Sequence, residues 1–178
     1  MLFRSQRPDL LLISGDLCQD ESLGGYVRLR EWLEQAVLPL GVAVALLPGN
    51  HDHPGLLRCA LGRCAVLAPA LLPLADWGLL LLDSHRPGAV EGWLEPHQWA
   101  WLDRQLVAPG PPLLVALHHP PLAIGSPELD PIGLRQGPAL VERLLASPRV
   151  RGVVCGHVHQ HWQGHLPRPG GEIGRAHV

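Results

Sequence analysis

Four short clusters of polar residues, each placed directly after an apolar run, constrain the fold of this chain more than any other feature. The apolar runs cover residues 10–13, 42–47, 113–117 and 150–154. The clusters that follow them are Gly15-Asp16, Gly49-Asn50-His51-Asp52, His118-His119-Pro120 and Gly156-His157-Val158-His159. Such runs are typical of buried strands, and a polar cluster after each run marks the start of a loop. We therefore expect one edge of one sheet to bring all four clusters together.

Segments with helical spacing separate these runs. The first begins after the cap-like residues 20–22, repeats apolar residues through Leu29, Leu33 and Val37, and is stopped by Pro39. Further helices are expected at residues 54–60, 95–107 and 138–146, and further strands near residues 66 and 71 and at 79–82. The alternation predicts an α/β fold with helices packed on sheet faces. The 178 residues are a one-domain length.

Composition excludes several classes of partner. The net charge is -2 and the fourteen basic side chains are scattered, so we expect no nucleic acid polymer as a partner. No apolar segment approaches the roughly 20 residues of a membrane-spanning helix, and the first residues do not resemble a signal peptide. We therefore expect a cytoplasmic protein without a membrane partner. The four cysteines lack the spacing of a zinc site, and we expect buried free thiols.

The polar clusters contain the residue types of a metal site. Carboxylate, amide and imidazole ligands together suit Mn, Fe or Zn, and the absence of thiolate ligands argues against a structural zinc site. Asp16 has two oxygens and can bridge two metals. Asn50, His118 and His157 would complete one metal, and His159 would face the other. Two metals about 3.5 to 4 Å apart can clamp the oxygens of an in-line displacement at phosphorus, which favours phosphoester hydrolysis.

The residues after Asn50 are the candidate acid–base group. His51 is expected to protonate the leaving oxygen or to stabilise its charge. Asp52 is expected to orient the His51 imidazole. Each of these residues alone has an ordinary structural explanation as a turn or a hydrogen-bonded side chain. Their joint occurrence in one order, each at the end of a strand, favours function.

On these motifs the chain resembles the calcineurin-like metallophosphoesterases, and within them the bacterial class III cyclic-AMP phosphodiesterases. The supporting segments are residues 15–20, 47–52, 80–84, 98–102, 118–120 and 155–160. The resemblance covers about residues 8–163. It implies a four-layer αββα sandwich of the metallo-dependent phosphatase type. It also implies that a dinuclear centre of Fe, Mn or Zn hydrolyses 3',5'-cyclic AMP, or a related cyclic nucleotide, to the 5'-monophosphate. The substrate partner would be a small molecule, and the oligomeric state stays open.

The resemblance also implies a role for each site residue. Asp16 would bridge the metals, Asn50, His118 and His157 would hold the second metal, and His159 would hold the first. His51 would contact the phosphate. His118 is preferred to His119 because the family pattern reads His-x-Pro with the ligand directly after the strand, and His119 is the fallback. The residues expected to touch the substrate are Asp16, Asn50, His51, His118 and His159.

The chain departs from the family pattern at both ends. The family has an opening strand with Asp-x-His, whereas residues 1–7 contain neither Asp nor His. We therefore expect a partial metallophosphoesterase domain over residues 1–171, incomplete at its N- and C-terminal strands, as in an internal fragment of a longer gene. Residues 172–178 resemble the translation of a sequencing adapter and are expected to be a non-native tail. Alone, the chain is expected to be poorly soluble or weakly active.

Two alternatives remain from the sequence. The substrate could be a non-cyclic phosphodiester or phosphomonoester, with specificity determined by pocket loops such as residues 126–132. The chain could instead be a catalytically inactive short protein that keeps one metal site for binding or structure.

Overall fold

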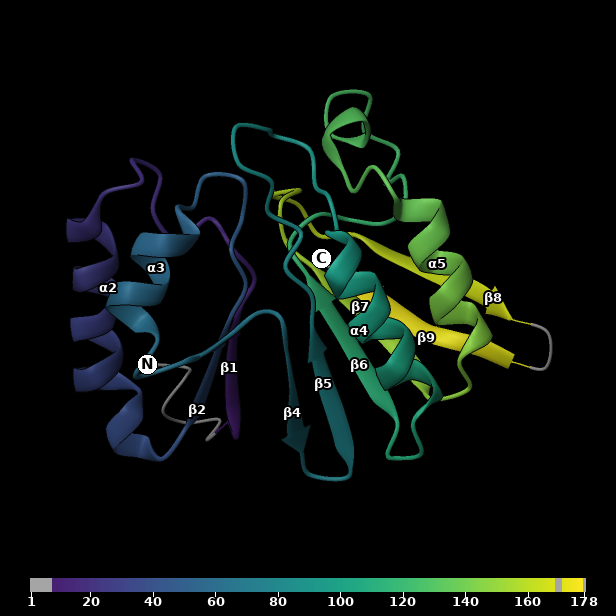
Figure 1. The fold of residues 1–178 in the computed structure, drawn as a ribbon, viewed down its shortest axis with the longest axis horizontal. Helices are drawn as coiled ribbons and strands as arrows, with labels where there is room; N and C mark the ends of the chain where they lie inside the picture. The colour runs from purple at the N-terminus through teal and green to yellow at the C-terminus, as the bar shows by residue number, and fades with distance from the viewer. Residues whose placement is uncertain (1–7, 169–170, 178) are drawn as a thin grey trace.

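Two sheets form the centre of the protein. The computed structural model describes residues 8–168 and 171–177 (Figure 1). The smaller sheet is parallel, in the order β1-β2-β3, and its strands are β1 (Leu10–Ile13), β2 (Ala43–Leu46) and β3 (Val66–Leu67). The short apolar runs of the sequence account for these strands, since each is buried or partly buried along most of its length.

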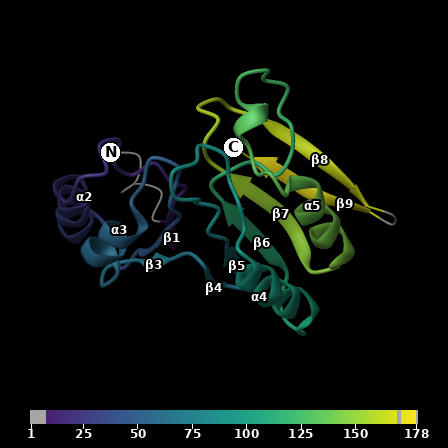
Figure 2. The ribbon, with the colours of Figure 1, turned by 45° about the horizontal axis from the view of Figure 1, so that its top comes forward.

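The larger sheet has six strands in the order β4-β5-β6-β7-β9-β8 (Figure 2). Its three central strands, β5, β6 and β7, are parallel, and the outer pairs β4–β5 and β8–β9 are antiparallel. The strands are β4 (Ala70–Leu74), β5 (Trp77–Leu81), β6 (Leu113–Leu117), β7 (Val150–Cys155), β8 (Gln163–Arg168) and β9 (Gly171–His177).

The four α-helices of the described residues begin where their sequences provide a start signal. In α2 (Leu23–Ala36), the side chain of Ser22 accepts a hydrogen bond from the backbone N–H of Gly25 at 3.1 Å. The helices α3 (Pro54–Leu61), α4 (Pro96–Val107) and α5 (Gly137–Ala146) each have proline in the first turn, where its missing N–H costs nothing. Two short 3₁₀ helices, η1 (Leu38–Leu40) and η2 (Asp130–Ile132), lie in the connections.

Three apolar interfaces divide the protein into four layers. Alternate residues of β2 point to opposite sides: Val44 and Leu46 pack with α2 and α3, whereas Ala45 contributes to the interface between the two sheets. On the far side of the larger sheet, Leu80 and Val115 pack with α4 and α5. The order helix, sheet, sheet, helix is visible in Figure 1. The predicted αββα sandwich is therefore confirmed.

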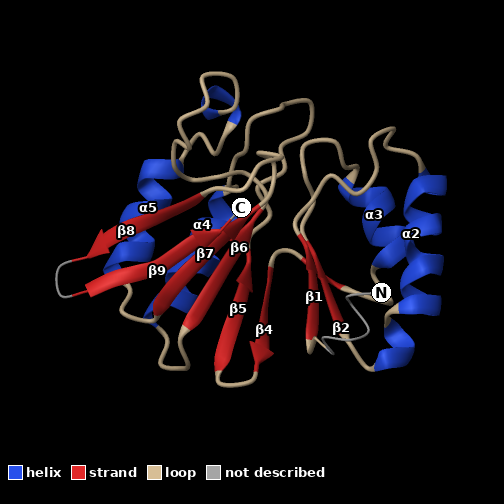
Figure 3. Cartoon of the chain, turned by 180° about the vertical axis from the view of Figure 1, so that it is seen from behind, coloured by secondary structure: helices blue, strands red, loops and turns tan. Residues whose placement is uncertain are grey.

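The expectation that one sheet collects the four clusters is wrong. The clusters at Asp16 and Asn50 follow β1 and β2 of the smaller sheet, and those at His118 and His157 follow β6 and β7 of the larger sheet. The loops after these strands lie at the same end of the sandwich (Figure 3). An apolar run shows where a strand ends, but it does not show with which strand it pairs.

Two strands that the sequence analysis did not predict follow β7. They are β8 and β9, an antiparallel pair in which Pro167 is opposite Glu172. The predicted domain boundary at residue 171 stays a prediction, and Val178 and residues 1–7 lie outside the described residues. Among the helices of the described segments, none has the length and apolar character needed to cross a bilayer. The cysteines are free as expected, but Cys59 is exposed rather than buried.

Candidate metal centre

Four side chains from the two sheets converge on one point. His118 Nε2 lies 3.4 Å from Asp16 Oδ2 and 3.2 Å from Asn50 Oδ1. His157 Nδ1 lies 3.0 Å from the same Asn50 oxygen and 3.3 Å from His118 Nε2. Two adjacent ligands of a metal bonded at about 2.1 Å are separated by about 3.0 to 3.4 Å. The spacing of the four donor atoms therefore fits a single metal ion held between the sheets.

A backbone carbonyl determines which nitrogen of His118 faces this point. His118 Nδ1 lies 2.6 Å from the Ser14 carbonyl oxygen, which can only accept a hydrogen bond. The proton of the neutral ring is therefore on Nδ1, and the lone pair of Nε2 points toward Asp16 and Asn50. A nitrogen lone pair and two oxygen atoms so close together repel one another unless a proton or a metal cation lies between them. This arrangement supports the predicted role of His118 on the geometry of the ring.

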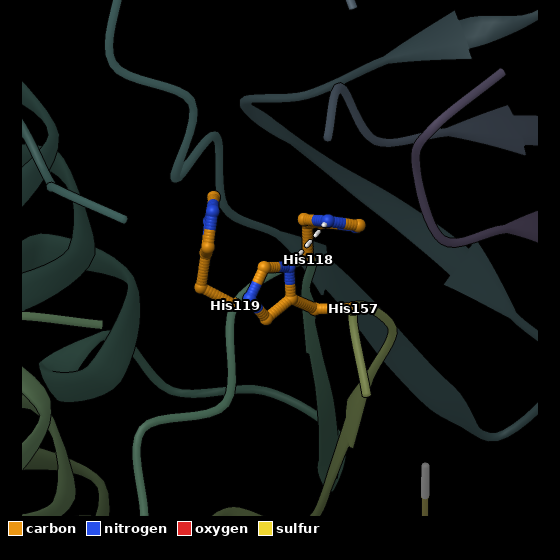
Figure 4. A group of neighbouring side chains, drawn as sticks. All are labelled: His118, His119 and His157. Carbon is orange, nitrogen blue, oxygen red and sulfur yellow. Dashed lines mark hydrogen bonds between the residues drawn. The ribbon is translucent and has the colours of Figure 1, made fainter. Parts of the chain in front are cut away.

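His119 is adjacent to this group but its ring is occupied elsewhere. The rings of His118, His119 and His157 lie within ligand-like distances of one another (Figure 4). His119 Nε2 donates to the carbonyl oxygen of Val90 at 3.1 Å, so its Nδ1 accepts from the buried Ser84 hydroxyl at 2.8 Å. Burial, followed by the neighbouring imidazoles, lowers the pKa of His119 to about 3. With both nitrogens bonded, His119 has no lone pair to offer, and the fallback assignment loses its basis.

Backbone conformation presents His157 to the site. His157 has φ of 73° in the turn after β7, a conformation that is uncommon for residues other than glycine. Burial, followed by the neighbouring His118, lowers the pKa of His157 to about 4, so its ring is neutral at pH 7. Its Nε2 is buried and has no hydrogen-bond partner among the residues that the structure describes. A neutral imidazole with Nδ1 toward the other donors is in the form that binds a metal.

Close backbone approach holds Asp16 beside these rings. A Cβ at Gly49 would overlap the Asp16 carboxylate, and a Cβ at Gly15, where φ is 110°, would overlap the His118 ring. Burial alone would raise the pKa of Asp16. A second proton on His118, at Nε2, gives this ring a hydrogen bond and a charge interaction with the carboxylate. Together with the His51 N–H at 3.0 Å, these outweigh burial and hold the pKa of Asp16 well below its usual range. Asp16 is therefore ionised at neutral pH, as a metal ligand must be.

Asp52 does not orient the His51 ring, which corrects its predicted role. Its buried carboxylate accepts the backbone N–H groups of Leu17 at 2.9 Å, Cys18 at 3.2 Å and Gly49 at 2.8 Å, and the Tyr26 hydroxyl at 3.1 Å. These bonds join the loop after β1 to the loop after β2. Asp52 therefore positions the segments that carry Asp16 and Asn50, and both of its oxygens are used in doing so.

Gln19 takes the role at His51 that the sequence analysis gave to Asp52. The Gln19 amide Nε2 donates to His51 Nδ1 at 3.1 Å. The other ring nitrogen, Nε2, therefore carries the proton and can donate it to a phosphate oxygen. Gln19 stands in the first motif quoted for the resemblance, so a sequence signal for it existed. Ser84, which supports His119, lies in the segment 80–84 quoted for the same resemblance, whereas Tyr26, which supports Asp52, had no comparable signal.

Two cavities adjoin the four donors. One of about 440 Å³ is lined by Asp16, His118, His157 and the exposed His159, which has φ of 50°. His159 therefore lies near the group, although none of its described contacts is with the four donor atoms. The other cavity, of about 470 Å³, includes Asn50. Neither is lined by residues 126–132, where the sequence analysis placed the specificity loop.

Comparison with known proteins identifies relatives. A probable cyclic nucleotide phosphodiesterase of Synechococcus sp. strain WH7803 is 44% identical over 165 residues, which cover 89% of this chain and 62% of the relative. The 3',5'-cyclic adenosine monophosphate phosphodiesterase CpdA of Pseudomonas aeruginosa is 39% identical over 155 residues, which cover 86% of this chain and 55% of the relative. The chain thus spans roughly three-fifths of the length of these curated relatives.

The fold has solved counterparts as well. A dimetal phosphatase from Danio rerio superposes with a TM-score of 0.71 at 16% identity, covering 99% of this chain and 73% of that protein. At that identity the likeness concerns the fold alone. The family model of the calcineurin-like phosphoesterases matches residues 1–161, which include all four clusters. On this match, and on the identity with the two bacterial relatives, the chain belongs to the calcineurin-like phosphoesterase family.

Proposed function

We propose that this chain carries the phosphate-binding centre of a dinuclear-metal phosphodiesterase that hydrolyses 3',5'-cyclic AMP, or a related cyclic nucleotide, to the 5'-monophosphate. The observation that supports this most directly is the convergence of Asp16, Asn50, His118 and His157 from two sheets. The printed names of the two bacterial relatives support the choice of a cyclic nucleotide.

The donor set fits a divalent metal. Asp16, Asn50, His118 and His157 would hold one ion, and Asp16 with His159, which line the same cavity, would contribute to a second. Fe, Mn and Zn all suit these oxygen and nitrogen donors. When bound, such ions polarise a phosphoryl oxygen and make water a stronger nucleophile at neutral pH.

His51 is placed to act on the leaving group. Hydrolysis to the 5'-monophosphate adds the oxygen of water to phosphorus and breaks the bond to the ribose 3' oxygen, which must gain a proton. The proton on His51 Nε2, fixed there by Gln19, can go to that oxygen or can stabilise its charge by a hydrogen bond. His51 is itself held by the bond from its backbone N–H to Asp16. The residue that would donate the proton is thus linked to a residue that would bind the metal.

The test separates metal binding from turnover. The 178-residue chain is loaded with Mn²⁺, its metal content is measured, and it is assayed on cyclic AMP, cyclic GMP and bis(p-nitrophenyl) phosphate. A second version carries the family's opening strand with Asp-x-His at its N-terminus. We expect the extended version to hydrolyse cyclic AMP and the shorter one to bind metal with weak turnover. Asp16→Asn should abolish turnover, and Glu142→Ala, an exposed change on α5, should not.

Each outcome bears on a different part of the proposal. Fast hydrolysis by the 178-residue chain would contradict the need for Asp-x-His. Hydrolysis of the generic diester without either cyclic nucleotide would contradict the substrate class. Metal binding without turnover in both versions would instead support an inactive metal-binding protein.

A further inference from the structure

A cavity beside Asn50 is lined mainly by residues that are not among the four metal donors. It has a volume of about 470 Å³ and is lined by segments that follow three different strands, β1, β2 and β5. Besides Asn50, it is lined by Glu21, Asp52, His53, Pro54, His85, Pro87, Gly88, Ala89 and Val90. The cavity is large enough for a small organic group and opens next to a residue of the phosphate site.

One wall is a flat, uncharged ring. His85 is half-buried, lies against the backbone of Asp52, and has the Asp52 carboxylate, Glu21 and His53 as charged or titratable neighbours. Its own backbone N–H donates to Asp83 at 3.0 Å, which fixes the start of this loop. Burial lowers the pKa of His85, so the ring is neutral near pH 7. A neutral imidazole beside proline and valine is a surface on which an aromatic base can stack.

The cavity also offers one hydrogen-bond donor and one acceptor. His53 Nδ1 accepts the backbone N–H of Leu56 at 3.3 Å, so the proton of its neutral ring is on Nε2, the remaining nitrogen. The Glu21 carboxylate forms no hydrogen bond or ion pair with any residue among those the structure describes, and it can only accept. Adenine has the complementary pair, since its 6-amino group donates and the adjacent ring nitrogen accepts.

We propose that this cavity is the base pocket of the substrate site and that Glu21 selects bases with an exocyclic amino group. This inference rests on the proposed function, because it assumes a cyclic nucleotide. The phosphate lies at the metal centre, and the ribose crosses Asn50 to place the base against His85. Hypoxanthine has an oxygen in place of the 6-amino group, which faces the carboxylate unfavourably.

The test uses nucleotides that the protein cannot hydrolyse further. Binding of AMP and IMP to the Mn²⁺-loaded 178-residue chain is measured by isothermal titration calorimetry. We expect AMP to bind about tenfold to a hundredfold more tightly than IMP, since the discriminating bond is to a charged group. Glu21→Ala should weaken the binding of AMP by a similar factor and bring the ratio of the AMP and IMP affinities close to one. Glu31→Ala, an exposed change on α2 that retains the pocket, should leave the ratio unchanged.

A second variant protects the test against misfolding. Glu21→Gln keeps a hydrogen-bond acceptor and adds a donor, so this variant should bind IMP more tightly than the wild type does. Its affinity for AMP should change by less than about threefold. A ratio that Glu21→Ala leaves unchanged overturns the base pocket and leaves the proposed function standing. If wild-type chain binds neither nucleotide but still binds Mn²⁺ and bis(p-nitrophenyl) phosphate, both the cyclic-nucleotide assignment and the base pocket fail.

Discussion

The hydroxyl of Tyr26 is expected to be a major stabiliser of the loops that carry Asp16 and Asn50. Tyr26 is fully buried, donates to Asp52 Oδ1 at 3.1 Å and accepts the backbone N–H of His53 at 2.7 Å. Tyr26→Phe removes one bond to a charged acceptor and leaves one buried N–H without its partner. Together these losses should lower the free energy of unfolding by about 3 kcal/mol. For a chain of this length the melting temperature should fall by about 6–12 °C.

A double-mutant cycle isolates the Tyr26–Asp52 pair. Urea unfolding followed by circular dichroism is measured for wild type, Tyr26→Phe, Asp52→Asn and the double variant, and the coupling energy should be about 1.5 kcal/mol. Ser126→Ala is the matched control, because its hydroxyl accepts only the Leu129 N–H at 3.3 Å in a partly exposed loop. That change should cost less than about 1 kcal/mol. If Tyr26→Phe lowers the free energy of unfolding by less than about 0.5 kcal/mol, or if the coupling energy is near zero, the Tyr26 hydroxyl does not stabilise these loops as argued.

Three further predictions concern charge and metal binding. The pKa of Asp16 is depressed in the folded protein, so its contribution to stability is complete above about pH 4 and is lost as the pH falls. In Asp16→Asn the urea midpoint should therefore fall less steeply as the pH is lowered below about 4. Burial raises the pKa of Asp83 to about 6, so stability should fall as the pH rises from about 4 to 6. Asp83→Asn should therefore gain about 1–3 kcal/mol in urea unfolding at pH 7 and lose that gain at pH 4. In titration calorimetry with Mn²⁺, His118→Ala should lower the affinity for the metal about 100-fold or more, and His119→Gln should lower it at most about tenfold. Equal losses of affinity would contradict the assignment of the two rings.

The parts of the fold that the sequence could predict are those that depend on neighbours in the chain. Apolar runs gave the strands near residues 10, 43, 113 and 150, and Ser22 and the prolines of α3, α4 and α5 gave the helix starts. The division of the strands between two sheets depends on pairings between distant residues, such as Leu10 with Ala43 and Leu114 with Gly152, which no local pattern specifies. Local signals therefore predicted the elements as far as β7 but not β8 and β9, and the layers were implied by the resemblance.

The candidate site shows the same limit at the level of side chains. Residue type and spacing indicated Asp16, Asn50, His118 and His157, because glycine turns at strand ends leave such side chains free to converge. The partner of each side chain was not predictable. Asp52 was expected to orient His51, yet its carboxylate accepts the backbone N–H groups of Leu17 and Gly49. A buried carboxylate must be satisfied by donors in reach, and one of these, Leu17, lies 35 residues away in the chain.

The division of the four donor residues between two sheets has a consequence for how the protein would assemble. An ion held by Asp16 and Asn50 on one side and by His118 and His157 on the other would act as a cross-link between two halves. These halves otherwise meet through apolar side chains such as Ala45, Leu47 and Leu79. Binding that requires both halves stabilises only the assembled form, by about 2.7 kcal/mol when free metal exceeds its dissociation constant a hundredfold. The supply of metal would then determine how much of the chain is in its native state, and chelation would loosen the sandwich along the seam between its sheets.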